Sequence, residues 1–206
     1  MKKMFLVSSF KDVANIFADF EKDLKGKTAT FIPTASKVEK VVFYVNSGKK
    51  ALEKMGVIVD KLDVSTATVD EIAAKIKGND FIYVTGGNTF FLLQELKRTG
   101  ADKLIIDEVN SGKLYVGESA GAMVTSANIE YVKGMDSVKN APDLKNFEAL
   151  GLVDFYTVPH YTNPPFKKIA QKIVDTYSSV LNVSPISNNE AILVSDNVVK
   201  TLSKGH

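Results

Sequence analysis

The sequence contains no cysteine among its 206 residues, and histidine occurs only twice. The absence of cysteine excludes disulfide bonds, thiolate nucleophiles and zinc sites built on sulfur. His206 is the last residue, and chain ends are commonly disordered, so His160 is the histidine expected in a functional site. A metal centre built from several histidines is therefore excluded.

An excess of positive charge is also missing, because 26 Lys and Arg residues balance 24 Asp and Glu residues to a net charge of +2. This balance argues against a dedicated DNA- or RNA-binding role. No apolar run approaches the roughly 20 residues of a membrane span. The run at residues 4–7 is too short for a signal peptide. We expect a soluble, cytoplasmic protein with residues 1–206 in a single domain.

Short apolar runs alternate with longer amphipathic segments in the first part of the chain. Apolar strands that are each followed by a helix indicate a parallel sheet covered on both faces. Right-handed crossovers then produce a doubly wound α/β fold. The predicted strands are residues 4–7, 28–32, 57–59, 81–84 and 114–116, and the predicted helices are residues 13–24, 38–55, 69–76, 90–97 and 104–109.

The pattern weakens beyond residue 125. Residues 129–132 and 153–158 are predicted strands, and residues 169–177 form a predicted helix. Two apolar segments, 192–194 and 198–199, flank Asp196 and Asn197. This spacing predicts a tight hairpin at the edge of the sheet.

Residues 117–121 read G-E-S-A-G, a G-x-S-x-G pattern between a predicted strand and a helix-prone segment. This setting is typical of a nucleophile elbow, a sharp turn that presents a serine hydroxyl at the carboxyl edge of a sheet. The nearby helix N-terminus favours an oxyanion. Ser119 is therefore a predicted nucleophile, and the alternative is a packing turn with a capping serine.

A serine hydroxyl needs a base to remove its proton, and His160 is the histidine available. It follows the predicted strand 153–158. Because the carboxyl ends of parallel strands lie at one edge of a sheet, we expect His160 to lie near Ser119. The alternative is a histidine held only by a backbone bond.

A third group is expected to orient the imidazole. Glu190 is favoured because its polar loop, residues 187–190, separates two apolar segments, and a carboxylate placed there needs a partner. The competing carboxylates are Asp154, Asp136 and Glu118.

Residues 85–89 read T-G-G-N-T and connect a predicted strand to a predicted helix. Paired glycines let the backbone approach a ligand closely, so this loop is expected to donate one N–H group to an oxyanion, with Ala120 donating the second. A phosphate cradle is the rival interpretation, although the loop lacks the lysine of a P-loop. A plain turn with Asn88 or Thr89 capping the helix is the third.

Together these segments resemble the serine peptidases that include α-aspartyl dipeptidase (dipeptidase E) and the cyanophycinases. The matching strings are residues 85–90, 117–122 and 159–163 and the Glu190 loop, in order over nearly the whole chain. The resemblance implies a fold related to class I glutamine amidotransferases and no metal or organic cofactor. It also implies a catalytic triad of Ser119, His160 and Glu190, with the N–H groups of Gly87 and Ala120 as the oxyanion hole.

The sequence departs from this family at several positions. Glu118 stands where other members carry an uncharged residue, and it either faces the site, favouring a free amine over an acidic substrate, or points to solvent. No arginine follows His160 to bind a substrate aspartate, and Lys167 or Lys168 replaces it only as a point charge. The residues expected to contact substrate are Asn88, Glu118 and Asp136.

The sequence therefore predicts a serine-type hydrolase that cleaves short peptides through an acyl-enzyme. One alternative is an esterase or amidase acting on a small acyl group. Another is a non-catalytic, flavodoxin-like module that binds an anion at residues 85–89.

Overall fold

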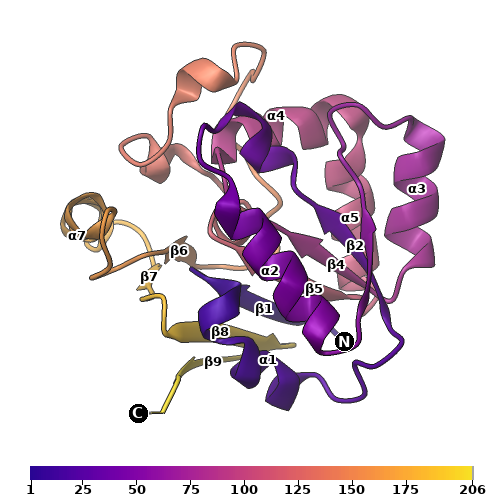
Figure 1. Cartoon of the computed structure of the whole chain (residues 1–206). Coiled ribbons are helices and arrows are strands. Elements are labelled where there is room, and N and C mark those ends of the chain that lie inside the picture. The colour runs from indigo at the N-terminus through magenta and orange to yellow at the C-terminus, as the bar shows by residue number, and fades with distance from the viewer. Residues whose placement is uncertain (206) are drawn as a thin grey trace.

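The computed structural model describes residues 1–205, so His206 lies outside the described residues. Its core is a seven-stranded sheet in the order β3-β2-β4-β5-β1-β8-β9 (Figure 1). The first five strands in this order are parallel, and β8 runs antiparallel to β1 and β9. The predicted mostly parallel α/β sheet with an edge hairpin is confirmed. The strands are β1 (Lys3–Val7), β2 (Thr28–Ile32), β3 (Ile58–Lys61), β4 (Phe81–Val84), β5 (Leu114–Glu118), β8 (Glu190–Ser195) and β9 (Val198–Ser203).

Helices cover both faces of this sheet because its central strands are apolar on both faces. In β1, Phe5 and Val7 pack beneath α1 (Ala14–Phe20) and α2 (Phe43–Lys54). The intervening Met4 and Leu6 belong to the core on the other face. That second face is covered by α3 (Val69–Gly78), α4 (Thr89–Thr99), α5 (Ala101–Asn110) and the short α6 (Ala120–Met123), as Figure 1 shows for the longer helices.

Two predicted elements differ from the structure. The predicted helix 38–55 is shorter in the structure, where α2 begins at Phe43. It is preceded by a 3₁₀ turn, η2 (Thr34–Val38), which ends where the helix was predicted to begin. Val41 and Val42 between them are exposed rather than packed. The predicted strand 129–132 is wrong, because this segment forms the 3₁₀ turn η3 (Glu130–Val132). Apolar runs this short do not distinguish a strand from a buried turn.

The segment before His160 does not join the main sheet. Its strand β6 (Tyr156–Val158) pairs with β7 (Val183–Pro185) in a separate two-stranded parallel sheet. These strands lie beside α7 (Lys167–Tyr177), apart from the main helical layers (Figure 1). The expectation that His160 follows a strand of the main parallel sheet is therefore wrong.

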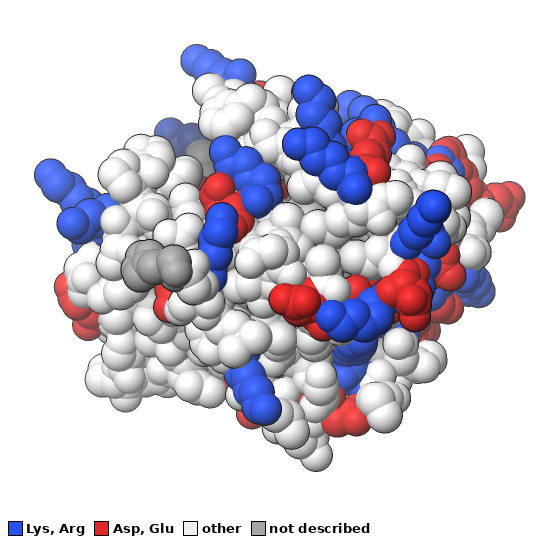
Figure 2. Space-filling view, turned by 60° about the horizontal axis from the view of Figure 1, so that its bottom comes forward, with Lys and Arg blue, Asp and Glu red and all other residues white. Residues whose placement is uncertain are grey.

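Charged side chains of both signs are interspersed on the face shown in Figure 2. Some of the charged residues of the described chain form ion pairs, such as those of Lys3 and Lys27 with Glu21. Within residues 1–205, no helix has both the length and the apolar character needed to cross a membrane.

Candidate active site

Ser119 lies on a strained turn between β5 and α6. Its backbone has φ 50° and ψ −105°, a conformation that non-glycine residues rarely adopt. The turn requires glycine on both sides. A Cβ on Gly117 would lie 2.5 Å from the Gly121 oxygen, and a Cβ on Gly121 would lie 2.2 Å from the Val84 oxygen. The G-x-S-x-G spacing thus reflects close backbone approach, and the turn is held by a 2.8 Å bond from Ser119 N to Val7 O.

His160 lies against Ser119, with Nε2 3.0 Å from the serine Oγ. It also has a positive φ, 60°. Its backbone N–H donates to Ser8 Oγ at 2.9 Å, and the same hydroxyl donates to Ile186 O at 3.0 Å. The imidazole stacks on Phe166 with ring centroids 4.9 Å apart. The structure therefore brings the predicted serine and histidine together, although the histidine comes from the smaller sheet.

Asn188, rather than Glu190, faces the other nitrogen of the imidazole. Its Oδ1 lies 2.8 Å from His160 Nδ1. Glu190 begins β8, and its Oε2 accepts from Ser187 N at 2.7 Å, while its Oε1 accepts from Ser203 Oγ at 3.4 Å. The expected position of Glu190 beside the histidine is corrected, because its carboxylate closes the turn that precedes β8.

Asn188 is not among the residues predicted for the site, although it lies in the polar loop 187–190. Asn163 holds this loop, since its Oδ1 accepts from Asn188 N at 2.8 Å. Asn163 lies three residues after His160, at the end of the P-H-Y-T-N string. That string was the available signal that the two loops meet.

The glycine loop after β4 lies directly beside Ser119. A Cβ on Gly86 would lie 3.2 Å from the Ser119 Cβ, and Gly87 has φ +134°, with no room for a side chain against Ala35. Within residues 1–205, the backbone N–H groups of Gly87 and Ala120 have no hydrogen-bond acceptor in the protein. Two free N–H groups close to a serine hydroxyl suit an oxyanion.

Asn88 caps helix α4. It is 1% exposed, its Oδ1 accepts from Phe91 N at 2.9 Å, and its Nδ2 donates to Ser137 O at 3.0 Å. Its backbone N–H donates to Ala35 O. The capping alternative therefore describes its geometry, and because Asn88 also lines the cleft beside Ser119, its contact with substrate stays a prediction.

Asp136 also contacts the start of α4. Its Oδ2 accepts from Thr89 N at 2.8 Å and from Thr89 Oγ1 at 2.5 Å. Burial is the main cause that raises the pKa of Asp136 to about 6, against the two Thr89 bonds. Asp136 lines the same cleft as Ser119, so it remains near any substrate.

Glu118 points neither to solvent nor freely into the site. It is 4% exposed, its Oε1 accepts from Phe10 N at 2.9 Å, and its Oε2 accepts from Tyr83 OH at 2.9 Å. Burial raises the pKa of Glu118 to about 7. Both oxygens are occupied by protein donors, so direct substrate binding by Glu118 is not supported.

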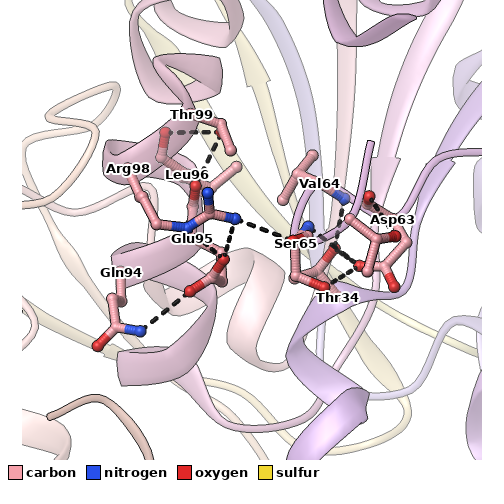
Figure 3. Close-up of polar contacts among 10 residues, drawn as sticks. Thr34, Asp63, Val64, Ser65, Gln94, Glu95, Leu96, Arg98 and Thr99 are labelled. Carbon is pink, nitrogen blue, oxygen red and sulfur yellow. Dashed lines mark hydrogen bonds and ion pairs between the residues drawn. The ribbon is translucent and has the colours of Figure 1, made fainter. Parts of the chain in front are cut away.

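Ser119 and His160 line a cleft of about 660 Å³. Three carboxylates that are at least partly accessible and one lysine also line this cleft. The sequence's one arginine, Arg98, is elsewhere on α4, where it donates to Glu95 Oε2 and Ser65 O (Figure 3). The accessible charged residues of the cleft are Lys11, Asp12, Glu39 and Asp136.

The imidazole is suited to act as a base. Burial lowers the pKa of His160, although the Asn188 bond opposes this shift. An amide oxygen accepts hydrogen bonds and does not donate them, so Nδ1 carries the hydrogen and Nε2 presents its lone pair to Ser119. A neutral imidazole nitrogen 3.0 Å from a hydroxyl oxygen can accept the hydroxyl proton.

Residues 4–202 match the family model described as peptidase family S51. The chain belongs to peptidase family S51. An uncharacterized peptidase of Listeria innocua is 66% identical over 98% of this chain and 96% of its own length. Another from Pasteurella multocida is 56% identical over 100% of this chain and 99% of its own length.

Relatives named peptidase E include one distant and one similar sequence. The Salmonella arizonae protein is 34% identical and aligns with 66% of this S51 chain and 56% of its own length. A 1.5 Å crystal structure of a Listeria monocytogenes protein, provisionally assigned as peptidase E, superposes with a TM-score of 0.97 at 60% identity over 100% of both chains. These similarities establish a peptidase.

Proposed function

We propose that this S51 peptidase hydrolyses short peptides through an acyl-enzyme on Ser119. The observation that carries the proposal is the 3.0 Å contact between Ser119 Oγ and His160 Nε2, on a serine held at positive φ. A hydroxyl becomes an effective nucleophile when a neutral base accepts its proton. The cleft that both residues line has room for a small peptide.

In the proposed reaction, His160 takes the Ser119 proton while Oγ attacks the carbonyl carbon of the scissile amide. The backbone N–H groups of Gly87 and Ala120 stabilise the resulting oxyanion. The imidazolium then returns the proton to the leaving nitrogen as the carbon–nitrogen bond breaks. A water molecule, deprotonated by His160, releases the acyl group and restores the free serine.

Asn188 orients the imidazole in this mechanism. Its oxygen fixes the Nδ1–H tautomer, which places the Nε2 lone pair toward Ser119. An amide carries no charge, so it stabilises the imidazolium less than a carboxylate would. In this mechanism the ability of His160 to act as a base therefore depends more on the orientation of its imidazole than on a neighbouring negative charge.

The test combines covalent labelling with a substrate screen. A fluorophosphonate probe is expected to label Ser119, located by mass spectrometry, and to leave the Ser119→Ala variant unlabelled. In a dipeptide library, Ser119→Ala is expected to lower turnover by about 10⁴-fold without loss of folding. Unchanged peptide hydrolysis in Ser119→Ala would remove the serine from the mechanism.

A parallel screen with p-nitrophenyl esters separates peptide hydrolysis from ester hydrolysis. Because the same nucleophile serves both reactions, the discriminating quantity is kcat/KM for matched dipeptides and esters. Because a p-nitrophenyl ester is intrinsically far more reactive than an amide, a measurable kcat/KM on the dipeptides identifies a peptidase, and activity on the esters alone would favour an esterase. Absence of labelling, together with thermal stabilisation by phosphate or nucleotides, would instead favour a non-catalytic module that binds an anion at the glycine loop.

A further inference from the structure

Glu118 is a buried carboxylate at a position where the fold expects an apolar side chain. Leu114 and Val116, which share its face of β5, belong to the core beneath α1 and α2. Burying a carboxylate is unfavourable unless hydrogen bonds replace its water. Glu118 has two such bonds, from Phe10 N and Tyr83 OH, each 2.9 Å long. The position immediately precedes Ser119, so its effects reach the site directly.

The bond to Phe10 fixes the segment that follows β1. Phe10 begins the 3₁₀ turn η1 (Phe10–Asp12), two residues after Ser8. Ser8 Oγ in turn accepts from the backbone N–H of His160 and donates to Ile186 O. These contacts form a closed ring. One side of the ring runs from Glu118 through its hydrogen bond to Phe10, and then along the chain to Ser8. The other side runs from Ser8 through its hydrogen bond to His160, and from His160 to Ser119, which follows Glu118 in the chain.

This ring adds polar contacts between two sheets that also share an apolar core. Ser119 follows a strand of the main sheet, whereas His160 follows the two-stranded sheet. Both residues have positive φ, and such backbone conformations persist when surrounding contacts hold them. Ser8 supplies a bond between the two sheets at the histidine itself, and Glu118 anchors the segment that carries Ser8.

We propose that Glu118 is a positioning residue that acts through Phe10 and Ser8 to set the placement of His160 against Ser119. The inference rests on the proposed function, because it assigns a role within that catalytic pair. A misplacement of about 1 Å between reacting groups lowers a rate by as much as about 10²-fold. The carboxylate therefore contributes to turnover without contacting substrate.

The ring is held more strongly when Glu118 is ionised. The Phe10 N–H can only donate, and it binds a charged carboxylate oxygen more strongly than a neutral one, whereas Tyr83 OH can donate to either form or accept from the protonated form. The titratable groups that face Glu118 are Tyr83 from β4, Tyr44 from α2, and Asp12 and Lys11 from η1. Asp12 raises and Lys11 lowers the pKa of Glu118, and burial dominates both effects.

The test measures the rate of fluorophosphonate labelling at Ser119, which reports on the serine and histidine without peptide binding, together with kcat and KM on a cleaved dipeptide. Glu118→Gln and Ser8→Ala are each expected to slow labelling and kcat about tenfold with little change in KM. Because both act through one ring, the double variant is expected to be no slower than the slower single variant. Labelling rates within twofold of wild type in both single variants, or fully multiplicative effects in the double variant, would overturn the proposal.

The pH profile distinguishes positioning from a purely structural role. Wild-type labelling is expected to fall in two steps as pH drops, one near pH 7 from Glu118 and one at lower pH from protonation of His160. This upper limb, near pH 7, is expected to vanish in Glu118→Gln, and the lower one is expected to remain. If Glu118→Gln does not fold, Tyr83→Phe serves instead. It removes a bond that lowers the pKa of Glu118, so the upper limb is expected to move to higher pH. An upper limb that stays in place in the folded variant contradicts the proposal.

Ser126→Ala is the matched control for loss of a buried hydroxyl. Ser126 is buried and its Oγ has no hydrogen-bond partner in the described chain, so labelling is expected to stay at the wild-type rate. The two proposals fail in different ways. Wild type that is labelled elsewhere than Ser119 contradicts the proposed function, whereas normal Ser119 labelling in both ring variants contradicts the role of Glu118 alone.

Discussion

Asn188 Oδ1 lies 2.8 Å from His160 Nδ1, so an uncharged amide occupies the orienting position of this serine–histidine pair. Replacing it with a carboxylate tests what the missing charge does. Asn188→Asp is expected to raise the pKa of His160, because a negative neighbour favours the imidazolium. The acid limb of the kcat/KM profile should then move to higher pH.

The Asn188→Ala variant provides the comparison. It removes the acceptor for Nδ1–H, so the tautomer is no longer fixed, and kcat is expected to fall by about 10²-fold or more. Equal kcat in Asn188→Ala and wild type would show that the contact has no role in turnover.

Glu190 is expected to matter for stability and little for chemistry. Glu190→Ala removes the acceptor of the Ser187 N–H at the turn before β8, and we expect a loss of about 1 kcal/mol in the free energy of unfolding. Urea denaturation measures this loss. A drop in the Ser119 labelling rate as large as that in Asn188→Ala would restore Glu190 to the catalytic machinery.

The charges of the cleft predict a preference among substrates. Asp12, Glu39 and Asp136 line it with Lys11 as the accessible cation, and Arg98 is bound to Glu95 outside it. An acidic side chain would meet like charge, which costs of the order of 1 kcal/mol near a protein surface. We therefore expect kcat/KM for Asp-Ala to be about fivefold or more below that for Ala-Ala, and Lys-Ala to equal or exceed Ala-Ala. A higher kcat/KM for Asp-Ala than for Ala-Ala would contradict the prediction that the cleft disfavours acidic side chains.

Gly121 is required by the close approach of the elbow to β4. In Gly121→Ala the new Cβ would lie 2.2 Å from Val84 O, so the turn or the strand must shift. We expect about 2–3 kcal/mol of destabilisation and loss of Ser119 labelling. Gly78→Ala is the matched control, because Gly78 ends α3 with no atom within 4 Å of an added Cβ, and its expected effect is a stabilisation of about 0.5 kcal/mol.

The raised pKa of Glu118 predicts how stability varies with pH. The folded state holds this proton up to about pH 7, whereas the ordinary value of the pKa is 4.5. The folded state therefore binds more protons between these values, and stability contributed by the protonated form is lost as pH rises through 7. A shift from 4.5 to about 7 corresponds to roughly 3 kcal/mol. Glu118→Gln lacks this dependence, so its Tm relative to wild type should increase from pH 5 to pH 8.

The sheet was predictable because its strands are apolar on both faces. The segments 28–32 and 81–84 match β2 and β4 at both ends, since Pro33 follows one and the glycine loop follows the other. Weakly patterned segments were not predictable. Ile129, Tyr131 and Val132 are apolar and buried in a turn, and buried apolar side chains are equally typical of a strand.

Within the site, the serine and histidine were predictable from residue type, and the third group was not. Asn188 and Glu190 lie two residues apart in one polar loop, and only the turn that Glu190 itself closes decides which side chain faces His160. The prediction for His160 was right about its neighbour and wrong about the strand that delivers it. His160 could be predicted because the sequence has only two histidines. Its location depends on the pairing of β6 with β7, which are far apart in the sequence.

The two halves of the reactive pair are supplied by different sheets, yet these sheets share one apolar core. Val158 of β6 and Ile186, which follows β7, are buried in the same cluster as Met4 and Leu6 of β1. Detaching the smaller sheet would open that core, so in a urea titration inactivation should coincide with the change in circular dichroism.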